Sequence, residues 1–221
     1  MKFPSRFALP VLALAGCFTV SAAFAQAPAA PAKEKLVEFK DIKISVQKTP
    51  DFALKGGTTD KRVRPKEWIE IEPEFKTGRP AGAKKAEVIP ELTFKYYVYL
   101  NSTVKENARI LTGEVIHVNV PIDELNHSVM YISPSTVLRV TGKPEGNPQL
   151  VSAYAVEVTS AGNVVGFFSK AGGATSTNPA DKKWWDLPSA PTKDEGGLLN
   201  KVQSPFAPLW ADYYADVKGV K

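Results

Sequence analysis

The amino-acid sequence predicts an all-β protein with the architecture of an immunoglobulin-like antiparallel β-sandwich. Apolar and polar residues alternate with a period of two in most segments between residues 36 and 170, as in strands with one buried and one solvated face. Turn-forming residues separate these segments at intervals typical of sandwiches. No amphipathic pattern long enough for a crossover helix lies between them, which disfavours a parallel sheet built from β-α-β units.

The chain begins with the composition of a secretory signal peptide, residues 1–25, which we exclude from the fold. Two processing sites compete within it. LAGC, ending at Cys17, has the form of a lipobox and would leave Cys17 as a lipid anchor, whereas AFA before Gln26 suits the ordinary signal peptidase. The residues after Cys17 are more apolar than a lipoprotein tether, so cleavage after Ala25 is favoured. Both routes export the protein, to the periplasm or to the outer membrane and cell surface.

Charge and cysteine content limit the kinds of partner and of stabilisation. Cys17 is the only cysteine, so a chain cleaved after Ala25 cannot form a disulfide and depends on apolar burial. The net charge of +5 falls to +3 once Lys2 and Arg6 are removed. That excess is too small to predict a nucleic-acid partner. Membrane association is expected only through partner proteins or a lipid on Cys17.

Two strands are predicted after a Pro/Ala-rich linker, residues 26–35. In FKDIKISVQ the apolar side chains alternate with polar ones from Ile42 to Val46. In WIEIEPEF apolar and acidic residues alternate, and Pro73 indicates an edge strand or a strand end because proline has no N–H to donate.

The next two segments are expected to lie in the middle of a sheet. ELTFKYYVYLN predicts a central strand, because one face carries five apolar or aromatic side chains: Leu92, Phe94, Tyr96, Val98 and Leu100. Tyr97 and Tyr99 fall on the opposite face. In GEVIHVNVPID the alternation places His117 and Asn119 outward and the β-branched residues inward.

Four shorter segments complete the predicted sandwich. SVMYIS and TVLRVTG are predicted as two short strands. LVSAYAVEV and NVVGFFS flank TSAGN, in which Gly162 and Asn163 tolerate left-handed backbone, so these segments predict a hairpin. The sequence therefore predicts seven or eight strands within a sandwich that spans residues 36–170.

Residues 171–221 form an aromatic, Gly/Pro-rich extension that contains the motif WWDLP. A short helix is predicted near residues 205–217, with Ser204 as its cap and Pro205 at its first position. Its apolar stripe would comprise Phe206, Leu209 or Trp210, Tyr213 and Val217. An isolated helix of this length is marginal in water, so we expect it to dock on its own sandwich or on a partner.

No catalytic, cofactor or metal site is expected. The chain has two histidines, His117 and His127, which are too few for a structural zinc site. No G-x-S-x-G nucleophile motif is present. Glu70, Glu72 and Glu74 recur at every second residue; such carboxylates can bind calcium, but the favoured interpretation is the solvated face of an edge strand.

Four aromatic residues are the candidate contacts to a partner or a glycan: Trp184, Trp185, Trp210 and Tyr213. Trp184 and Trp185 in WWDLP could stack on sugar rings as exposed loop aromatics. The alternative, which we favour, is that they close over the sandwich as a plug. Tyr97 and Tyr99 could be covered by the predicted C-terminal helix.

Several segments together resemble a known family. The AFA site before QAPAAP, the strands EFKDIKISVQ, YYVYLN and GEVIHVNVP, and the WWDLP motif resemble the pilus-associated immunoglobulin-like exported proteins of Akkermansia-type Verrucomicrobia, whose genes lie among type IV pilus assembly genes. The resemblance extends over essentially the whole chain. It implies a non-enzymatic accessory or structural protein of the envelope whose partners are envelope or pilus-assembly proteins. The alternative from the residues alone is a carbohydrate-binding module for glycan or mucin adhesion through exposed aromatics.

Overall fold

The computed structural model describes residues 35–51, 64–80, 88–102 and 105–219. The predicted signal peptide, Cys17 with its possible lipid, and residues 26–34 of the predicted linker lie outside the described residues.

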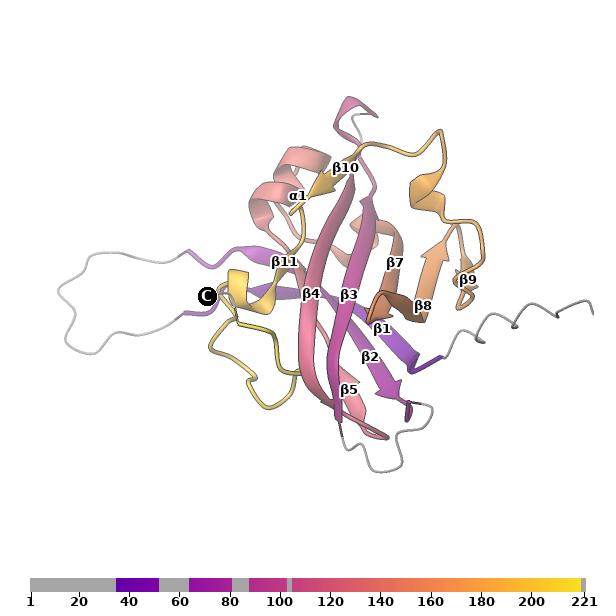
Figure 1. Cartoon of the computed structure of the whole chain (residues 1–221). Coiled ribbons are helices and arrows are strands. Elements are labelled where there is room, and N and C mark those ends of the chain that lie inside the picture. The colour runs from indigo at the N-terminus through magenta and orange to yellow at the C-terminus, as the bar shows by residue number, and fades with distance from the viewer. Residues whose placement is uncertain (1–34, 52–63, 81–87, 103–104, 220–221) are drawn as a thin grey trace, which may run out of the picture. The chain divides into compact units, whose positions relative to one another are not determined.

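The described residues form two β-sheets (Figure 1). The first sheet comprises β1 (Val37–Lys48), β2 (Glu67–Thr77), β5 (Leu125–His127), β6 (Met130–Ile132) and β11 (Leu199–Asn200). The second sheet comprises β10 (Lys193–Glu195), β4 (Ile110–Pro121), β3 (Val88–Leu100), β7 (Val151–Ser160), β8 (Asn163–Ala171) and β9 (Ala174–Ser176). All strand pairs are antiparallel except β10 with β4. One α-helix, α1 (Pro134–Thr141), and four 3₁₀ turns, Lys105–Asn107, Pro148–Leu150, Trp184–Asp186 and Lys201–Gln203, complete the described elements.

The strand order is that of an immunoglobulin-like sandwich. In the first sheet β1, β2 and β6 lie in that order, and in the second the order is β4, β3, β7 and β8. Consecutive strands thus change sheets between β2 and β3 and return for β6, which is the Greek-key connection of this fold. The predicted all-β sandwich is confirmed.

The predicted central strand is confirmed as β3. It pairs with β4 on one side and with β7 on the other, and all five predicted inward side chains are fully buried. Phe94 lies 4.8 Å, between ring centroids, from Phe75 of the first sheet, and Phe39 of β1 packs edge-on against Phe94. These aromatic rings join the two layers, so the core lies between the sheets.

The prediction that Pro73 marks an edge strand or a strand end is wrong. Pro73 lies inside β2, and β2 is the central strand of the first sheet, with β1 on one side and β6 and β5 on the other. Pro73 falls where the partner of β2 changes from β6 to β5, so its missing N–H breaks no ladder hydrogen bond there. Its carbonyl accepts a hydrogen bond from the Ser128 N–H at 3.1 Å.

The predicted outward position of His117 is also wrong. His117 is 1% exposed and pairs with the buried Leu92, whereas the next inward pair is Val120 with Ile89, three residues away on each strand. Asn119 in this interval has φ 52°, a left-handed conformation that disrupts regular alternation. The alternation of inward and outward side chains therefore shifts by one residue in both strands between these two inward pairs, and His117 faces the core.

One strand prediction and one helix prediction are wrong. TVLRVTG lies in α1 rather than in a strand, because Ser133 caps the first turn through its side chain, Pro134 occupies the first position and Gly142 ends the helix at φ 75°. The helix predicted near residues 205–217 is absent from that stretch, which folds as consecutive turns. Pro208 lies within it, and a proline there removes a helical hydrogen bond and clashes with the preceding turn.

The C-terminal extension contributes strands to both sheets. β10 pairs with the outer edge of β4, and β11 pairs with β6. Residues 193–200 therefore connect the two sheets at the edges formed by β4 and β6. Gly113 of β4 permits this approach: a Cβ there would lie 2.6 Å from Leu198 Cβ and 2.9 Å from the Leu198 carbonyl oxygen.

We expect Gly113→Ala to lower the free energy of unfolding by about 1–3 kcal/mol, because the Leu198 backbone must shift to admit the methyl group. Urea unfolding followed by circular dichroism measures this change. Gly219→Ala is the control, since a Cβ at Gly219 would meet no atom within 4 Å. Equal stability of the two variants would contradict the close approach.

Candidate functional site

The last described residues form a strap, residues 204–218, that crosses the outer face of the first sheet. Phe206 stacks on Tyr131 of β6 with ring centroids 4.6 Å apart, and it lies edge-on to Trp68 of β2 at 5.9 Å. The strap then reaches the second sheet, where the Val118 N–H donates to the Asp216 carbonyl at 3.0 Å and the Lys218 N–H donates to the Ile116 carbonyl at 2.8 Å. The strap is therefore fixed to both layers.

The row of three glutamates on β2 lies mostly under this strap. Glu72 accepts hydrogen bonds from the Tyr213 hydroxyl at 2.8 Å and from the Tyr214 hydroxyl at 3.4 Å, and His127 Nδ1 lies 3.2 Å from the same carboxylate. Glu70 is 3% exposed and accepts from Ser45 and Gln47 of β1. The interpretation of this row as the solvated face of an edge strand is therefore wrong.

These carboxylates bind the strap rather than form an obvious metal site. Partial burial and then the adjacent Glu72 carboxylate raise the pKa of Tyr213 to about 12, and burial, followed by Glu70 and Glu72, raises the pKa of Tyr214 well above its usual value. Both hydroxyls thus remain protonated donors. Among the described residues no group of three or more His, Cys, Asp or Glu side chains is placed to hold a metal ion.

A buried chain of hydrogen bonds connects the two sheets and the strap through His117. The Tyr96 hydroxyl of β3 donates to Ser128 Oγ at 2.7 Å, and Ser128 Oγ lies 2.6 Å from His117 Nε2. His117 Nδ1 lies 3.0 Å from the Ala215 carbonyl and 3.2 Å from that of Asp216. Because carbonyl groups only accept, Nδ1 carries the proton, and Nε2 accepts from Ser128.

Burial lowers the pKa of His117 to about 4, although the carbonyls of Asp216 and Ala215 oppose this shift. The imidazole is therefore neutral at pH 7. The contact between Ser128 and His117 has the distance of a nucleophile and its base. However, Ser128 is 0% exposed and His117 1% exposed, so no substrate reaches the pair in this conformation.

The tryptophans of WWDLP cover the outer face of the second sheet. Trp185 stacks on Tyr97 with centroids 4.5 Å apart and is 2% exposed, while Phe167 lies 6.0 Å away. Trp184 is half-buried, and its indole N–H donates to Ser169 Oγ at 3.1 Å. Trp185 therefore has no exposed ring for a glycan in this structure. The Trp184–Asp186 turn, rather than a C-terminal helix, covers Tyr97.

The other two candidate aromatics lie on the surface of the strap. Trp210 is 44% exposed and Tyr213 49% exposed. A turn joins them, because the Tyr213 N–H donates to the Trp210 carbonyl at 3.3 Å. Each ring has an aromatic neighbour from the protein: Trp210 stacks on Phe206 at 6.2 Å, and Tyr213 stacks on His127 at 4.2 Å.

The backbone at Trp210 is strained. Trp210 has φ 54°, a left-handed conformation in which a bulky side chain is a true outlier. Such strain persists only where the surrounding structure enforces it, and it is concentrated at functional positions. Sequence reasoning named Trp210 and Tyr213 but gave them the wrong secondary structure.

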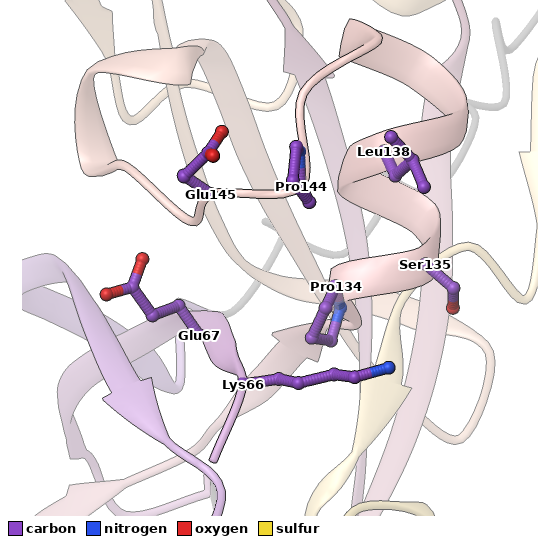
Figure 2. Close-up of a pocket in the computed structure, with 7 residues that line it drawn as sticks. All are labelled: Lys66, Glu67, Pro134, Ser135, Leu138, Pro144 and Glu145. Atoms are coloured by element: carbon purple, nitrogen blue, oxygen red, sulfur yellow. The ribbon is translucent and has the colours of Figure 1, made fainter. Parts of the chain in front are cut away.

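A separate shallow groove of about 310 Å³ lies beside α1. Figure 2 shows Pro134, Leu138 and Pro144 around it, with Glu67 and Glu145 on the side away from the helix. Lys66 and Ser135 complete its lining. The groove lacks a histidine or cysteine and a pair of convergent polar groups, so its composition does not indicate an active site.

Three comparisons with known proteins bear on this chain. A protein-family model matches residues 28–221, which is most of the sequence. A crystal structure of a protein from Akkermansia muciniphila is similar, with a TM-score of 0.67 and 29% sequence identity over 84% of this chain and 94% of that chain. No curated protein matches. None of the helices in the described part of the chain is long and apolar enough to cross a membrane.

We expect the free energy of unfolding to fall by about 3 kcal/mol as the pH drops from 6.5 to 4, because the folded state holds His117 neutral with a pKa near 4 while the unfolded chain takes up a proton with a pKa near 6.5. Urea unfolding at pH 7.0, 5.5 and 4.5 measures this slope. His117→Gln should lose less stability than the wild type between pH 7.0 and pH 4.5, whatever the stability of the variant at pH 7.0. Parallel slopes for the two proteins would contradict the buried neutral histidine.

Truncation of the two neighbouring tryptophans should have unequal effects. Trp185→Ala is expected to lower the free energy of unfolding by about 3–5 kcal/mol, since it empties a buried stack. Trp184→Ala should lower it by less, about 1–3 kcal/mol, because the half-buried indole loses one hydrogen bond and its edge-on packing against Trp185. Urea unfolding measures both. A glycan array in which the wild type binds and Trp184→Ala, still folded, does not would contradict a purely structural role for the motif.

Proposed function

This chain belongs to the family that the matching model represents, and on that premise we propose that it is a non-enzymatic exported protein of the envelope that acts through protein–protein contacts. Its binding surface is formed by Trp210 and Tyr213 on the strap. The partners are envelope or pilus-assembly proteins, and the chain is an accessory or structural component associated with type IV pili.

The observation that carries this proposal is the strained, exposed Trp210. A residue at φ 54° with a ring 44% exposed opposes both the backbone preference of an L-residue and the tendency of indole to be buried. The strap could cover the first sheet with a glycine at this position. Exposed aromatic side chains held in a fixed geometry are the anchors that dominate protein–protein binding energy.

Two further observations support a binding role over a catalytic one. The Ser128–His117 pair is sealed from solvent, and the groove beside α1 lacks convergent polar groups. The likeness to a protein of Akkermansia muciniphila and the sequence resemblance to pilus-associated exported proteins support the placement in the envelope. Either cleavage after Ala25 or a lipid on Cys17 is consistent with this placement.

Trp210→Gly separates binding from stability. Glycine adopts φ near 54° without strain, which relieves about 1 kcal/mol or more and offsets the lost packing of the indole on Phe206. We therefore expect the variant to unfold at nearly the wild-type temperature but to lose its partners in affinity capture from detergent-solubilised envelopes of the native organism.

The control is Leu138→Ala, because Leu138 is similarly exposed, at 48%, but lies on α1. Capture of the same partners by wild type, Leu138→Ala and Trp210→Gly alike would remove the strap surface from the proposal. Deleting residues 204–221 is a poorer test, because it also removes the carbonyl groups that bind His117.

A further inference from the structure

The residues around Trp210 and Tyr213 indicate which chemical group of the partner binds there, a question that the proposed function leaves open. The two residues are the first and fourth of a hydrogen-bonded turn, whose end Cα atoms lie within about 7 Å of each other. Asp212 occupies the third position of this turn and is exposed. The exposed carboxylate of Asp212 therefore belongs to the same turn as the two exposed aromatic residues.

The second source of negative charge is β2, beneath Tyr213. The Tyr213 hydroxyl donates to Glu72, and the largest charge effects on this hydroxyl come from three carboxylates: Glu72, Glu74 and Glu70. Two lysines lie near these carboxylates. Lys201 has its Nζ 5.9 Å from the ring centroid of Tyr214 and is 9% exposed, and the exposed Lys43 of β1 pairs with Glu72.

The sign of this local field is opposite to that of the whole protein. The chain cleaved after Ala25 carries a net charge of +3, so a generally anionic partner would be attracted to other parts of its surface rather than to this turn. An acidic, aromatic surface of this kind complements a cation, because aromatic faces attract ammonium and guanidinium groups and carboxylates add charge attraction.

We infer that the surface formed by Trp210, Asp212 and Tyr213 binds an arginine or lysine side chain presented by an extended segment of the partner protein. This inference rests on the proposed function, since it names the group by which the partner is held. Arginine fits better than lysine, because its planar guanidinium stacks on aromatic rings while it donates to carboxylates. A neutral glycan could stack on the rings and donate hydrogen bonds to Asp212, but it would gain no charge attraction from that carboxylate.

The probe is the peptide acetyl-Gly-Arg-Gly-Arg-Gly-amide, titrated into the ¹⁵N-labelled mature protein. The matched control peptide carries citrulline, which keeps the shape of arginine without its charge. The indole N–H signal of Trp210 is identified by its absence from the spectrum of Trp210→Gly. We expect this signal to shift saturably with the arginine peptide. The citrulline peptide should bind at least about fivefold more weakly.

Charge variants then test the carboxylate. Asp212→Asn keeps the aromatic rings and should weaken arginine binding about two- to threefold, with a further loss as NaCl rises from 50 to 500 mM. Leu138→Ala should bind as the wild type does. Equal binding of the two peptides, no saturable shift, or stronger binding of the neutral sugar chitotriose would each overturn the inference.

The two proposals fail separately. If Trp210→Gly loses its envelope partners but citrulline and arginine peptides bind alike, the strap is a binding surface without selectivity for a cation. If the arginine peptide binds as described and Trp210→Gly still captures every partner, the cation site exists but is not the one that holds those partners.

Discussion

The hydrogen-bond chain through His117 is the constraint on which the outer parts of this protein depend. It begins on the second sheet at Tyr96, crosses to Ser128 between β5 and β6 of the first sheet, returns to His117 and ends at the strap carbonyls of Ala215 and Asp216. Each link has one donor and one acceptor. Loss of any member leaves the others buried and unsatisfied, which costs more than the bond itself contributes. The strap is thereby tied to the core of the sandwich and does not simply rest on its surface.

This tie matters because a chain cleaved after Ala25 would have no cysteine, whereas many immunoglobulin domains join their sheets by a disulfide. In this protein the chain segments at both sides of the sandwich approach each other closely through a glycine. On one side Gly113 admits Leu198 between the sheets, and on the other Gly166 admits Val37, with the Leu36 N–H donating to the Val165 carbonyl. The strap and β10 also cover most of the outer edge of β4, and covered edges prevent pairing with other chains.

The sequence predicted those parts of the fold that local patterns determine. The alternation in β3 and the hairpin of β7 and β8 depend on neighbouring residues, and both were found. The left-handed residues of the hairpin turn are Ala161 and Gly162, however, and not Gly162 and Asn163. The inward side of His117 could not be predicted, because it follows from a lost step of alternation at Pro90 and Asn119 on two paired strands. The caps of α1 were visible as Ser133, Pro134 and Gly142, but the β-branched residues between them concealed the helix. The cover over Glu72 comes from residues 141 positions away, beyond any local pattern.

The two aromatic segments of the extension show how covering and binding separate in this fold. Trp185 turns entirely inward onto Tyr97, and Trp184 follows it with its indole N–H satisfied by Ser169, so this pair serves the sandwich. The aromatic residues of the strap are of two kinds. Phe206 and Tyr214 are buried against the first sheet, while Trp210 and Tyr213 are exposed. Covering alone would favour small or polar residues at the outward positions, and a glycine at φ 54°. The chain instead holds an indole there against its backbone preference. The indole contributes its packing on Phe206 and Tyr214 to the fold, but it remains 44% exposed, and this exposed part is the surface that the proposed contact with a partner would use.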